Sequence, residues 1–388
     1  MDINWDEIRK EQFPLFENSI HLKAAGGSPM SKAAYDAGIK YFQDLHTNGD
    51  IFWDEYFLEL DKARQMVADY LNCNLNEVAF LINTSSGINT ISRLLKKGEI
   101  LYPTGEFPSS IHIFKSLGFK TKKIEVQQDN SYSLLDIEKK VTSDSKYLIH
   151  SHVQYLTGFR QDLDELGKLC KKFNIMNLIN ATQSFGAFPL DVKNQNIDML
   201  VASGLKWACS GYGIGILYIN DKHIINADLP FSSWLSVSNA FSMNNENMNI
   251  IKKTRSLDGL GGTPNFPALM AFKGGLSLIK DIGKGNIKDG VENIKNRIIF
   301  LSSEFINQIQ NLDLKIISPI TLKNRSGIVS IENERAEMIY NKLLSNNIYI
   351  SLRNYPGSRK KNLLRFAFNY YNNLDDITKV IKILGEFK

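Results

Sequence analysis

A lysine in an apolar setting is the residue of this chain with the clearest chemical potential. Lys206 lies between Ser203 and Trp207, after the apolar run 197–201 and before the glycine-rich stretch 211–215. Loss of water around a lysine favours the neutral amine, and a neutral amine can form an imine with an aldehyde. Most lysines are surface residues whose stems cover apolar neighbours. This segment alone therefore leaves both interpretations open.

A polar segment upstream favours the chemical interpretation. Residues 177–180 are predicted to form a buried strand that ends in polar residues and a glycine turn, and Lys206 follows about one supersecondary unit later. This arrangement resembles the class V aminotransferase group of fold type I enzymes, which use pyridoxal 5′-phosphate (PLP). The group includes cysteine desulfurases, isopenicillin-N epimerase-like proteins and kynureninase, and its members carry Asp-x-x-Gln followed by Ser-x-His-Lys. Two positions differ here, because Asn180 replaces the Asp and Leu205 replaces the usual His.

The pattern of strands and helices predicts an α/β protein with a second, smaller part. Between residues 31 and 222 the two kinds of pattern alternate, which is typical of a mainly parallel sheet with buried strands. Strands are expected at 78–82, 100–101, 121–126, 147–149, 176–179, 197–201 and 216–219, and helices at 54–70, 86–96 and 163–173. After Pro264 we expect helices at 268–282, 287–312, 336–345 and 374–385, and strands at 327–331, 348–352 and 363–366.

The resemblance implies fold type I for the whole chain. The large domain would hold a mainly parallel seven-stranded sheet, and the smaller C-terminal domain would be α+β. We expect residues 1–19 to be an N-terminal segment that packs with the small domain. Residues 20–265 would form the PLP-binding domain, and residues 266–388 the connecting helices and the small domain.

The end of the first predicted strand offers groups for an anion. Thr84, Ser85 and Ser86 open a helix, where free amides and hydroxyls can bind a phosphate. Serine and threonine also occur at such places as ordinary helix caps. Class V enzymes bind the PLP phosphate here, so the resemblance implies that these residues and Ser203 hold it. Leu205 cannot supply the hydrogen bond that the histidine of the group would give.

The resemblance assigns further residues to the cofactor. Phe107 would stack on the pyridine ring, Asn180 would face the ring nitrogen, and Gln183 would donate to the phenolic oxygen. Thr263, in Gly261-Gly262-Thr263, matches a segment that reaches the phosphate of the neighbouring subunit, which implies a homodimer with shared active sites. A core phenylalanine and a plain turn are the alternatives for Phe107 and Thr263.

Other polar residues are candidates for substrate binding. Arg365 lies on a predicted strand of the second domain, where class V enzymes place an arginine that binds the substrate carboxylate in a bidentate way. Arg353 is a weaker candidate. Gln154, in a Val-Gln-Tyr-x-Thr-Gly segment, could reach the cofactor edge or the substrate. His152 is expected in the core, with a role as proton carrier as the alternative.

The bulk composition excludes several classes of protein. The 388 residues are 43% hydrophobic, and the net charge of +5 is spread along the chain, which argues against nucleic-acid binding. Three cysteines without a CxxC pair indicate a reducing compartment, with neither a disulfide framework nor a metal site. No signal peptide or membrane-spanning run is visible, so we expect no membrane contact and a cytoplasmic location.

The expected function is that of a PLP-dependent enzyme that uses Lys206 and acts on a small amino acid or a related amine. Transamination is the first hypothesis, β-elimination or a C–S lyase the second, and a kynureninase-like hydrolase is included. A degenerate PLP-binding protein is the alternative of another class. No cysteine follows Cys209, which argues against a desulfurase with a cysteine nucleophile in the C-terminal domain. A neutral Asn180 would weaken the electron sink, so the chain is expected to be a poorer transaminase than its family name suggests. The alternative is that Asn180 is a tolerated near-isostere of aspartate, with water or Thr182 compensating.

Overall fold

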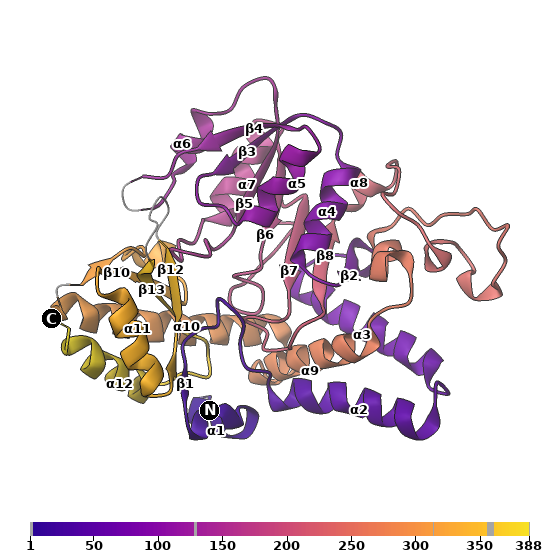
Figure 1. Cartoon of the computed structure of the whole chain (residues 1–388). Helices are drawn as coiled ribbons and strands as arrows, with labels where there is room; N and C mark the ends of the chain where they lie inside the picture. Colours follow the sequence, from indigo (N-terminus) through magenta and orange to yellow (C-terminus); the bar gives the residue numbers. More distant parts are fainter. Residues whose placement is uncertain (1–2, 128–129, 313, 355–360, 388) are drawn as a thin grey trace.

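A seven-stranded sheet forms the centre of the large part of the molecule (Figure 1). A computed structural model describes residues 3–127, 130–312, 314–354 and 361–387. The strand order is β2-β8-β7-β6-β5-β3-β4, and every neighbouring pair is parallel except the two that involve β8. The strands are β2 (Val78–Leu81), β3 (Glu99–Pro103), β4 (Lys120–Ile124), β5 (Ser145–Ser151), β6 (Met176–Asn180), β7 (Met199–Ser203) and β8 (Gly215–Ile219). The predicted mainly parallel sheet is therefore confirmed.

Helices cover both faces of this sheet, as the buried strands require. β2, β3, β7 and β8 are buried along their whole length. In Figure 1, α2, α3 and α9 lie below the sheet, while α4, α5 and α6 lie higher. The helices of this part are α2 (Lys32–Asn48), α3 (Trp53–Leu71), α4 (Thr84–Leu94), α5 (Pro108–Ser116), α6 (Leu134–Glu138), α7 (Leu163–Lys172) and α8 (Asp221–Ile224).

Two long helices lead to the C-terminal part of the chain. They are α9 (Phe266–Ile282), which packs closely against α2, and α10 (Ile287–Ile309). Beyond them an antiparallel sheet in the order β12-β13-β10-β9 shares a separate core with α11 (Ala336–Ser345) and α12 (Leu374–Gly385). Its strands are β9 (Lys315–Ile316), β10 (Ile328–Glu332), β12 (Ser351–Asn354) and β13 (Lys361–Ala367).

The single strand predicted at 348–352 is wrong. The structure divides it at Ile350 into β11 (Ile348–Tyr349) and β12. β11 pairs in parallel with β1 (Ile20–His21), whereas β12 belongs to the C-terminal sheet. The alternation of side chains is the same in one strand or two, so the sequence pattern did not reveal a partner more than 300 residues away.

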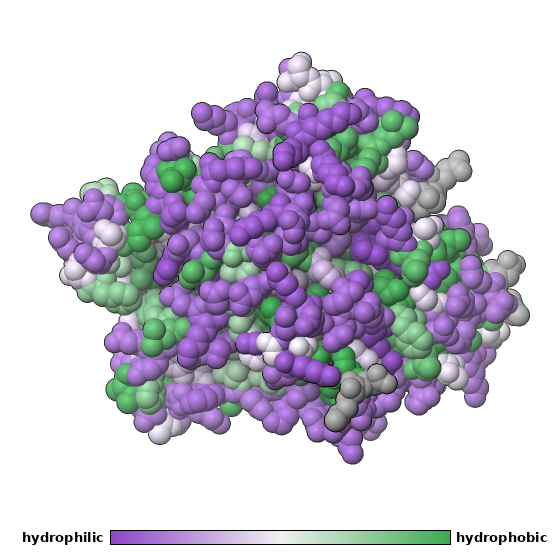
Figure 2. Space-filling model, turned by 180° about the vertical axis from the view of Figure 1, so that it is seen from behind, coloured by the Kyte–Doolittle hydropathy of each residue, from purple (hydrophilic) through white to green (hydrophobic). Residues whose placement is uncertain are grey.

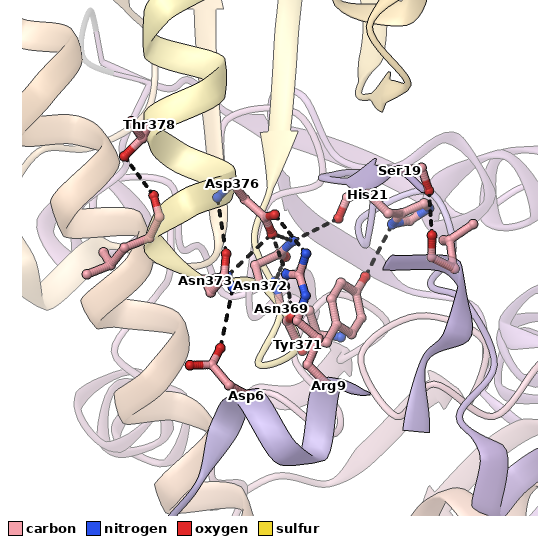
Figure 3. A network of polar contacts seen from close by, with 12 residues as sticks. Asp6, Arg9, Ser19, His21, Asn369, Tyr371, Asn372, Asn373, Asp376 and Thr378 are labelled. Atoms are coloured by element: carbon pink, nitrogen blue, oxygen red, sulfur yellow. Dashed lines mark hydrogen bonds and ion pairs between the residues drawn. The ribbon is translucent and has the colours of Figure 1, made fainter. Parts of the chain in front are cut away.

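A polar network joins the start of the chain to its end (Figure 3). Arg9, on α1 (Trp5–Gln12), donates to both carboxylate oxygens of Asp376 at 2.7 and 2.9 Å and to the carbonyl oxygen of Tyr371 at 2.9 Å. The hydroxyl of Tyr371 lies 3.3 Å from Nδ1 of His21, and burial lowers the pKa of His21 to about 4. The N-terminal segment thus packs against the C-terminal part, while the proposed domain limits stay predictions.

An arm formed by residues 225–253 extends from the large part (Figure 1). It contains the short helices η3 (Trp234–Ser236) and η4 (Ala240–Ser242), and η5 (Thr254–Gly261) returns the chain to the body. Phe241, Met243 and Met248 are all more than half exposed on it. Figure 2 shows the back face, which is mostly hydrophilic with separate hydrophobic patches, some of them on the side that holds the arm. Among the described helices, none has the length and apolar character that a membrane crossing requires.

Candidate active site

Polar residues at the carboxyl ends of β5, β6 and β7 meet at one cavity of about 180 Å³. Ligands of parallel α/β sheets commonly bind at this edge. Seven of the predicted site residues line the cavity, whereas Ser86, Gln154, Thr263, Arg353 and Arg365 do not. The lining residues are Asn83, Thr84, Ser85, Phe107, Ser109, Ser151, Tyr155, Asn180, Thr182, Gln183, Ser203, Leu205 and Lys206.

Lys206 lies in the turn directly after β7 and is partly buried. Burial lowers the pKa of its amine to about 7, and the positive charges of Arg365 and Arg353 act in the same direction. No salt bridge of Lys206 is present in the described part of the chain, and no carboxylate lines the cavity there. The amine is therefore largely neutral at slightly alkaline pH, which is the state that a nucleophilic lysine needs.

The turn from β2 into α4 forms one wall of the cavity. Asn83 caps α4, because its Oδ1 accepts from the amide of Ser86 at 2.9 Å, and the hydroxyl of Ser86 donates back to the carbonyl of Asn83 at 2.6 Å. Ser86 therefore has the ordinary capping role, and the structure does not bring it to the cavity. Thr84 and Ser85 remain at the helix start, with Thr84 Oγ1 2.7 Å from Thr182 Oγ1.

A glycine of β8 allows this turn to approach the sheet. A Cβ atom on Gly215 would lie 2.5 Å from the carbonyl carbon of Asn83, so any side chain would push the turn away. Close packing against Asn83 therefore explains why one member of the glycine-rich stretch, Gly215, has no side chain. The earlier members of this stretch, Gly211 and Gly213, have φ angles of 76° and 101°, which favour glycine.

Ser203 provides a test of whether an anion fits this cavity. The residue is 1% exposed, and its hydroxyl is buried without a hydrogen-bond partner although it lines the cavity. Such an unpaired group costs about 1–3 kcal/mol, which a phosphate oxygen would recover. The first backbone N–H groups of α4 likewise have no acceptor within the helix, and a phosphate could supply one. Leu205 lines the cavity without a polar atom to offer, as the sequence indicated.

Hydrogen bonds determine the orientation of the Asn180 amide. Its Oδ1 accepts from the backbone N–H of Thr182 at 3.0 Å, and its Nδ2 donates to Ser110 Oγ at 3.1 Å. A backbone N–H can only donate, so the amide cannot be turned round. One Nδ2 hydrogen is then left for a group in the cavity.

Gln183 is held in a similar way. Its Oε1 accepts from the indole N–H of Trp207 at 3.0 Å, and its Nε2 donates to the carbonyl of Ala25 at 2.9 Å. Because one Nε2 hydrogen has a protein partner, a single hydrogen remains for a ligand. The predicted donation to a phenolic oxygen stays compatible with this arrangement.

Arg365 is a buried cation with neutral partners only. It is 2% exposed on β13, and it donates to the carbonyl of Tyr155 at 2.6 Å and to Ser351 Oγ at 3.2 Å. Its Nε has no partner, and burial together with the charge of Arg353 lowers its pKa to about 9. Arg365 lies behind Tyr155 and not in the cavity wall, and Arg353 is exposed on β12.

Gln154 and His152 do not face the cavity. Gln154 Nε2 donates to Glu106 Oε1 at 2.8 Å. His152 is 4% exposed, with its ring edge against Phe188 and its Nδ1 without a partner. Burial lowers the pKa of His152 far below its usual value, so the core role is the better interpretation.

Glu106 is a buried residue beside the site that the sequence analysis missed, as it also missed the cavity-lining residues Ser109, Ser151 and Tyr155. It is 9% exposed, directly precedes Phe107, and accepts from both the amide and the hydroxyl of Ser151 at 3.0 Å. Burial raises the pKa of this carboxyl to about 7. A single acidic residue in a loop is usually at the surface. Its place beside the predicted ring-stacking residue was the one signal that could have identified it.

Phe107 and Thr263 retain exposed side chains. The ring of Phe107 is 42% exposed at the cavity mouth, and it meets Tyr155 edge to face with centroids 5.2 Å apart. Thr263 is exposed beyond η5 and outside the cavity. Larger hollows of about 480 and 660 Å³ lie elsewhere and are lined mainly by surface lysines, asparagines and apolar side chains. Among the described residues that line these two hollows, none carries a buried polar side-chain atom without a partner, as Ser203 does.

The lowered pKa of Lys206 has a consequence for the stability of the apoprotein. The unfolded chain binds a proton at Lys206 up to about pH 10.4, whereas the folded chain releases it near pH 7, so stability due to this group rises with pH between those values. Lys206→Met should therefore stabilise the apoprotein below pH 7, with about 1.4 kcal/mol for each unit of lowering as the upper bound. The gain should vanish toward pH 10.

Denaturant unfolding of the apoprotein at several pH values measures this effect. Lys97→Met, at an exposed lysine, is the matched control and should show no such pH-dependent gain. A Lys206→Met variant whose stability relative to wild type does not change with pH would contradict a desolvated amine at this position.

Comparison with known proteins supports the assignment of the fold. A family model described as aminotransferase class V matches residues 20–380. A probable cysteine desulfurase from Pyrococcus abyssi is 24% identical and covers 98% of this chain and 97% of its own. The apo structure of a cysteine desulfurase from Thermococcus onnurineus NA1 superimposes with a TM-score of 0.86 at 22% identity, over 100% and 98% of the two chains. The cystine C–S lyase C-DES gives a TM-score of 0.85 at 19% identity, over 97% and 99%.

The family match spans nearly the whole chain and includes every residue that lines the cavity. The structural likenesses, at identities below 25%, concern the fold. The resemblance inferred from the residues around Lys206 is confirmed, and the chain belongs to the class V aminotransferase family of PLP-dependent enzymes.

Proposed function

We propose that this protein uses PLP to remove a substituent from the β-carbon of a small α-amino acid of the cysteine type. The observation that carries the proposal is a pair of basic side chains, Lys206 in the cavity wall and Arg365 behind Tyr155, which are withdrawn from water without a carboxylate partner among the described residues. Buried charges are costly unless they are paired. A phosphate-bearing aldehyde and an amino-acid carboxylate are the ligands that supply the missing partners.

The residues of the cavity fit PLP in this role. Lys206 would hold it covalently, the unpaired hydroxyl of Ser203 and the start of α4 would bind its phosphate, and Phe107 would cover its ring. Asn180 and Gln183 each have one hydrogen left for it. When bound, PLP supplies an electron sink that makes the α-proton of an amino acid removable.

Lys206 would also move that proton. A general base works best when its pKa lies near the working pH, and burial brings the pKa of Lys206 to about 7. The cations nearby keep this value low without competing for the proton, because a guanidinium does not accept one. The same burial thus serves both covalent attachment and proton transfer at Nζ.

Arg365 is the proposed partner of the substrate carboxylate. Its Nε has no partner, and its two present acceptors are uncharged oxygens. A carboxylate would provide the charge-assisted bonds that arginine makes in a bidentate way. Because Tyr155 lies between Arg365 and the cavity, substrate entry would require Tyr155 to release its carbonyl contact or shift its side chain.

Asn180 is the reason for preferring elimination to transamination. Its amide is neutral and offers a hydrogen to the ring nitrogen, which keeps that nitrogen unprotonated and the electron sink weak. Elimination depends less on the sink, since the leaving group removes the electrons at once. Transamination must return a proton to the cofactor instead, so it loses more from the neutral amide.

The cysteines do not support a desulfurase with a cysteine nucleophile. Cys73, Cys170 and Cys209 are all outside the cavity wall, and none follows Cys209 in the sequence. Burial raises the pKa of Cys209 to about 12, so its thiol stays protonated. Release of sulfur by elimination requires no such nucleophile.

A homodimer with shared sites is part of the proposal. Phe241 of the arm packs edge to face on Phe57 of α3, with centroids 5.3 Å apart, and Leu58 and Met243, close to them in the sequence, are also exposed. A second copy of the chain would cover these side chains, and exposed Thr263 would serve the phosphate of the partner. Cytoplasmic location also stays a prediction.

The reaction is tested by product analysis of the PLP-loaded protein. L-cystine should give pyruvate and ammonia in equal amounts, faster than the cofactor is converted to its amine form. Asn180→Asp should raise the transamination half-reaction relative to elimination by roughly tenfold, the equivalent of one pKa unit at the ring nitrogen. Accumulation of the amine form without pyruvate, or an unchanged ratio in the variant, would contradict the proposal.

Arg365 is tested by substrate affinity. Arg365→Ala should raise KM by about tenfold to a hundredfold, because hydrogen bonds to charged groups contribute about 1.5–3 kcal/mol each. Arg365→Lys should recover little of the lost substrate affinity, because lysine keeps the charge but cannot bind a carboxylate in a bidentate way. Arg353→Ala is the control, with a smaller effect expected from its exposed position. Equal KM values for the wild type and Arg365→Ala would refute this role, provided that PLP binding is retained.

Sharing of sites is tested by mixing two inactive chains. Lys206→Ala and Thr263→Ala subunits should form mixed dimers with one intact site of the two. No recovery of activity after verified subunit exchange, or a monomer in sedimentation, would count against the shared site.

A further inference from the structure

The carboxylate of Glu106 is surrounded by hydrogen-bond donors. Oε1 accepts from the amide of Ser151 at 3.0 Å and from Gln154 Nε2 at 2.8 Å, and Oε2 accepts from Ser151 Oγ at 3.0 Å. The hydroxyl of Ser110 lies close enough to this carboxylate to lower its pKa. These donors stabilise the ionised form of a side chain that is 9% exposed, while burial brings the pKa of the carboxyl to about 7, so Glu106 is an anion above about pH 7.

The Ser110 hydroxyl connects this carboxylate to Asn180. Ser110 Oγ accepts from Asn180 Nδ2 at 3.1 Å, so its own hydrogen is available for Glu106. The orientation of the Asn180 amide is determined by the N–H of Thr182. When Glu106 is ionised, the direction of donation therefore runs from Asn180 through Ser110 to Glu106.

The connection from Glu106 to Asn180 adds negative charge to a site that is otherwise rich in positive charge. Lys206 and Arg365 contribute positive charge, and the described residues that line the cavity include no carboxylate. The class V group carries its aspartate at the position of Asn180. In this chain the Ser110 hydroxyl lies between Asn180 and the carboxylate of Glu106. Glu106 is also hydrogen-bonded to Ser151, which itself lines the cavity.

We propose that Glu106 is a positioning residue that acts on Asn180 through Ser110. Its carboxylate supplies part of the negative potential that an aspartate at position 180 would give to the cavity. This inference rests on the proposed function, since it concerns bound PLP. The anion pulls on the Asn180 amide and raises the proton affinity of groups in the cavity. The neutral residue at 180 thus weakens the electron sink without abolishing it.

Other titratable groups near Glu106 do not carry this effect. Tyr132 and Tyr155 are the two tyrosines whose pKa values respond to its charge, and burial raises both pKa values above the usual one. Both therefore stay neutral over the working range. Arg365 lies beyond Tyr155 and stays cationic.

The test uses the PLP-loaded protein without substrate. Its visible absorbance changes with pH when the bound cofactor gains or loses a proton, so the midpoint reports proton affinity in the cavity and not turnover. Glu106→Gln should lower that midpoint by about one pH unit, and Ser110→Ala should lower it in the same direction by less. The PLP dissociation constant, measured alongside, shows whether the site itself survives.

Two further variants separate charge from shape. The double variant Glu106→Gln with Asn180→Asp moves the negative charge from behind Ser110 to position 180 itself, and it should restore the midpoint to the wild-type value or above. Glu99→Gln is the matched control, because Glu99 is also buried, lies at the other end of β3 and accepts from Ser145 Oγ at 2.8 Å. It should leave the midpoint unchanged.

The outcomes distinguish this inference from the proposed function. If the wild type takes up no PLP on Lys206, the proposed function fails. If PLP binds and Glu106→Gln shifts the midpoint no more than Glu99→Gln does, only the inference is overturned. A lowered midpoint that the double variant does not restore would also overturn it, since Glu106 would then act by structure alone. Should Glu106→Gln not fold, an unshifted midpoint in Ser110→Ala decides against the inference.

Discussion

The burial of cationic side chains without a carboxylate partner is the constraint on which the rest of this structure depends. Lys206 and Arg365 both lose part of their hydration, and burial lowers the pKa of each. A folded protein tolerates such a cost where a ligand repays it. The unpaired Nε of Arg365 and the unpaired hydroxyl of Ser203 are further signs of the same incomplete site.

The sheet topology brings these groups together from distant parts of the chain. β5, β6 and β7 are parallel, so Ser151, Asn180 and Ser203 end at one edge, and the turn to Lys206 follows there. β8 runs in the opposite direction, which brings Gly215 against the turn that opens α4. The C-terminal sheet then adds Arg365 behind Tyr155. The site is thus a product of strand order and not of a single motif.

The buried strands and the role of the lysine could be predicted from the sequence because both leave local patterns in it. β2 and β7 are mostly apolar runs in the sequence, and Lys206 follows the second of them beside glycines. The division of residues 348–352 into two strands could not be predicted, because it depends on the pairing of β11 with the distant strand β1. The buried state of Glu106 depends on how neighbouring turns pack, whereas the capping role of Ser86 was one of the two interpretations that the local sequence allowed. The roles of the cavity residues toward PLP stay predictions.

The central claim is that Lys206 is the amine that holds the cofactor. Borohydride reduction of the PLP-loaded protein, followed by peptide mass mapping, tests it most directly because reduction makes the attachment permanent. The account predicts a label on the peptide that contains Lys206 and on no other lysine, with none on Lys206→Met. A label on a different lysine, or no label after verified PLP uptake, would contradict it.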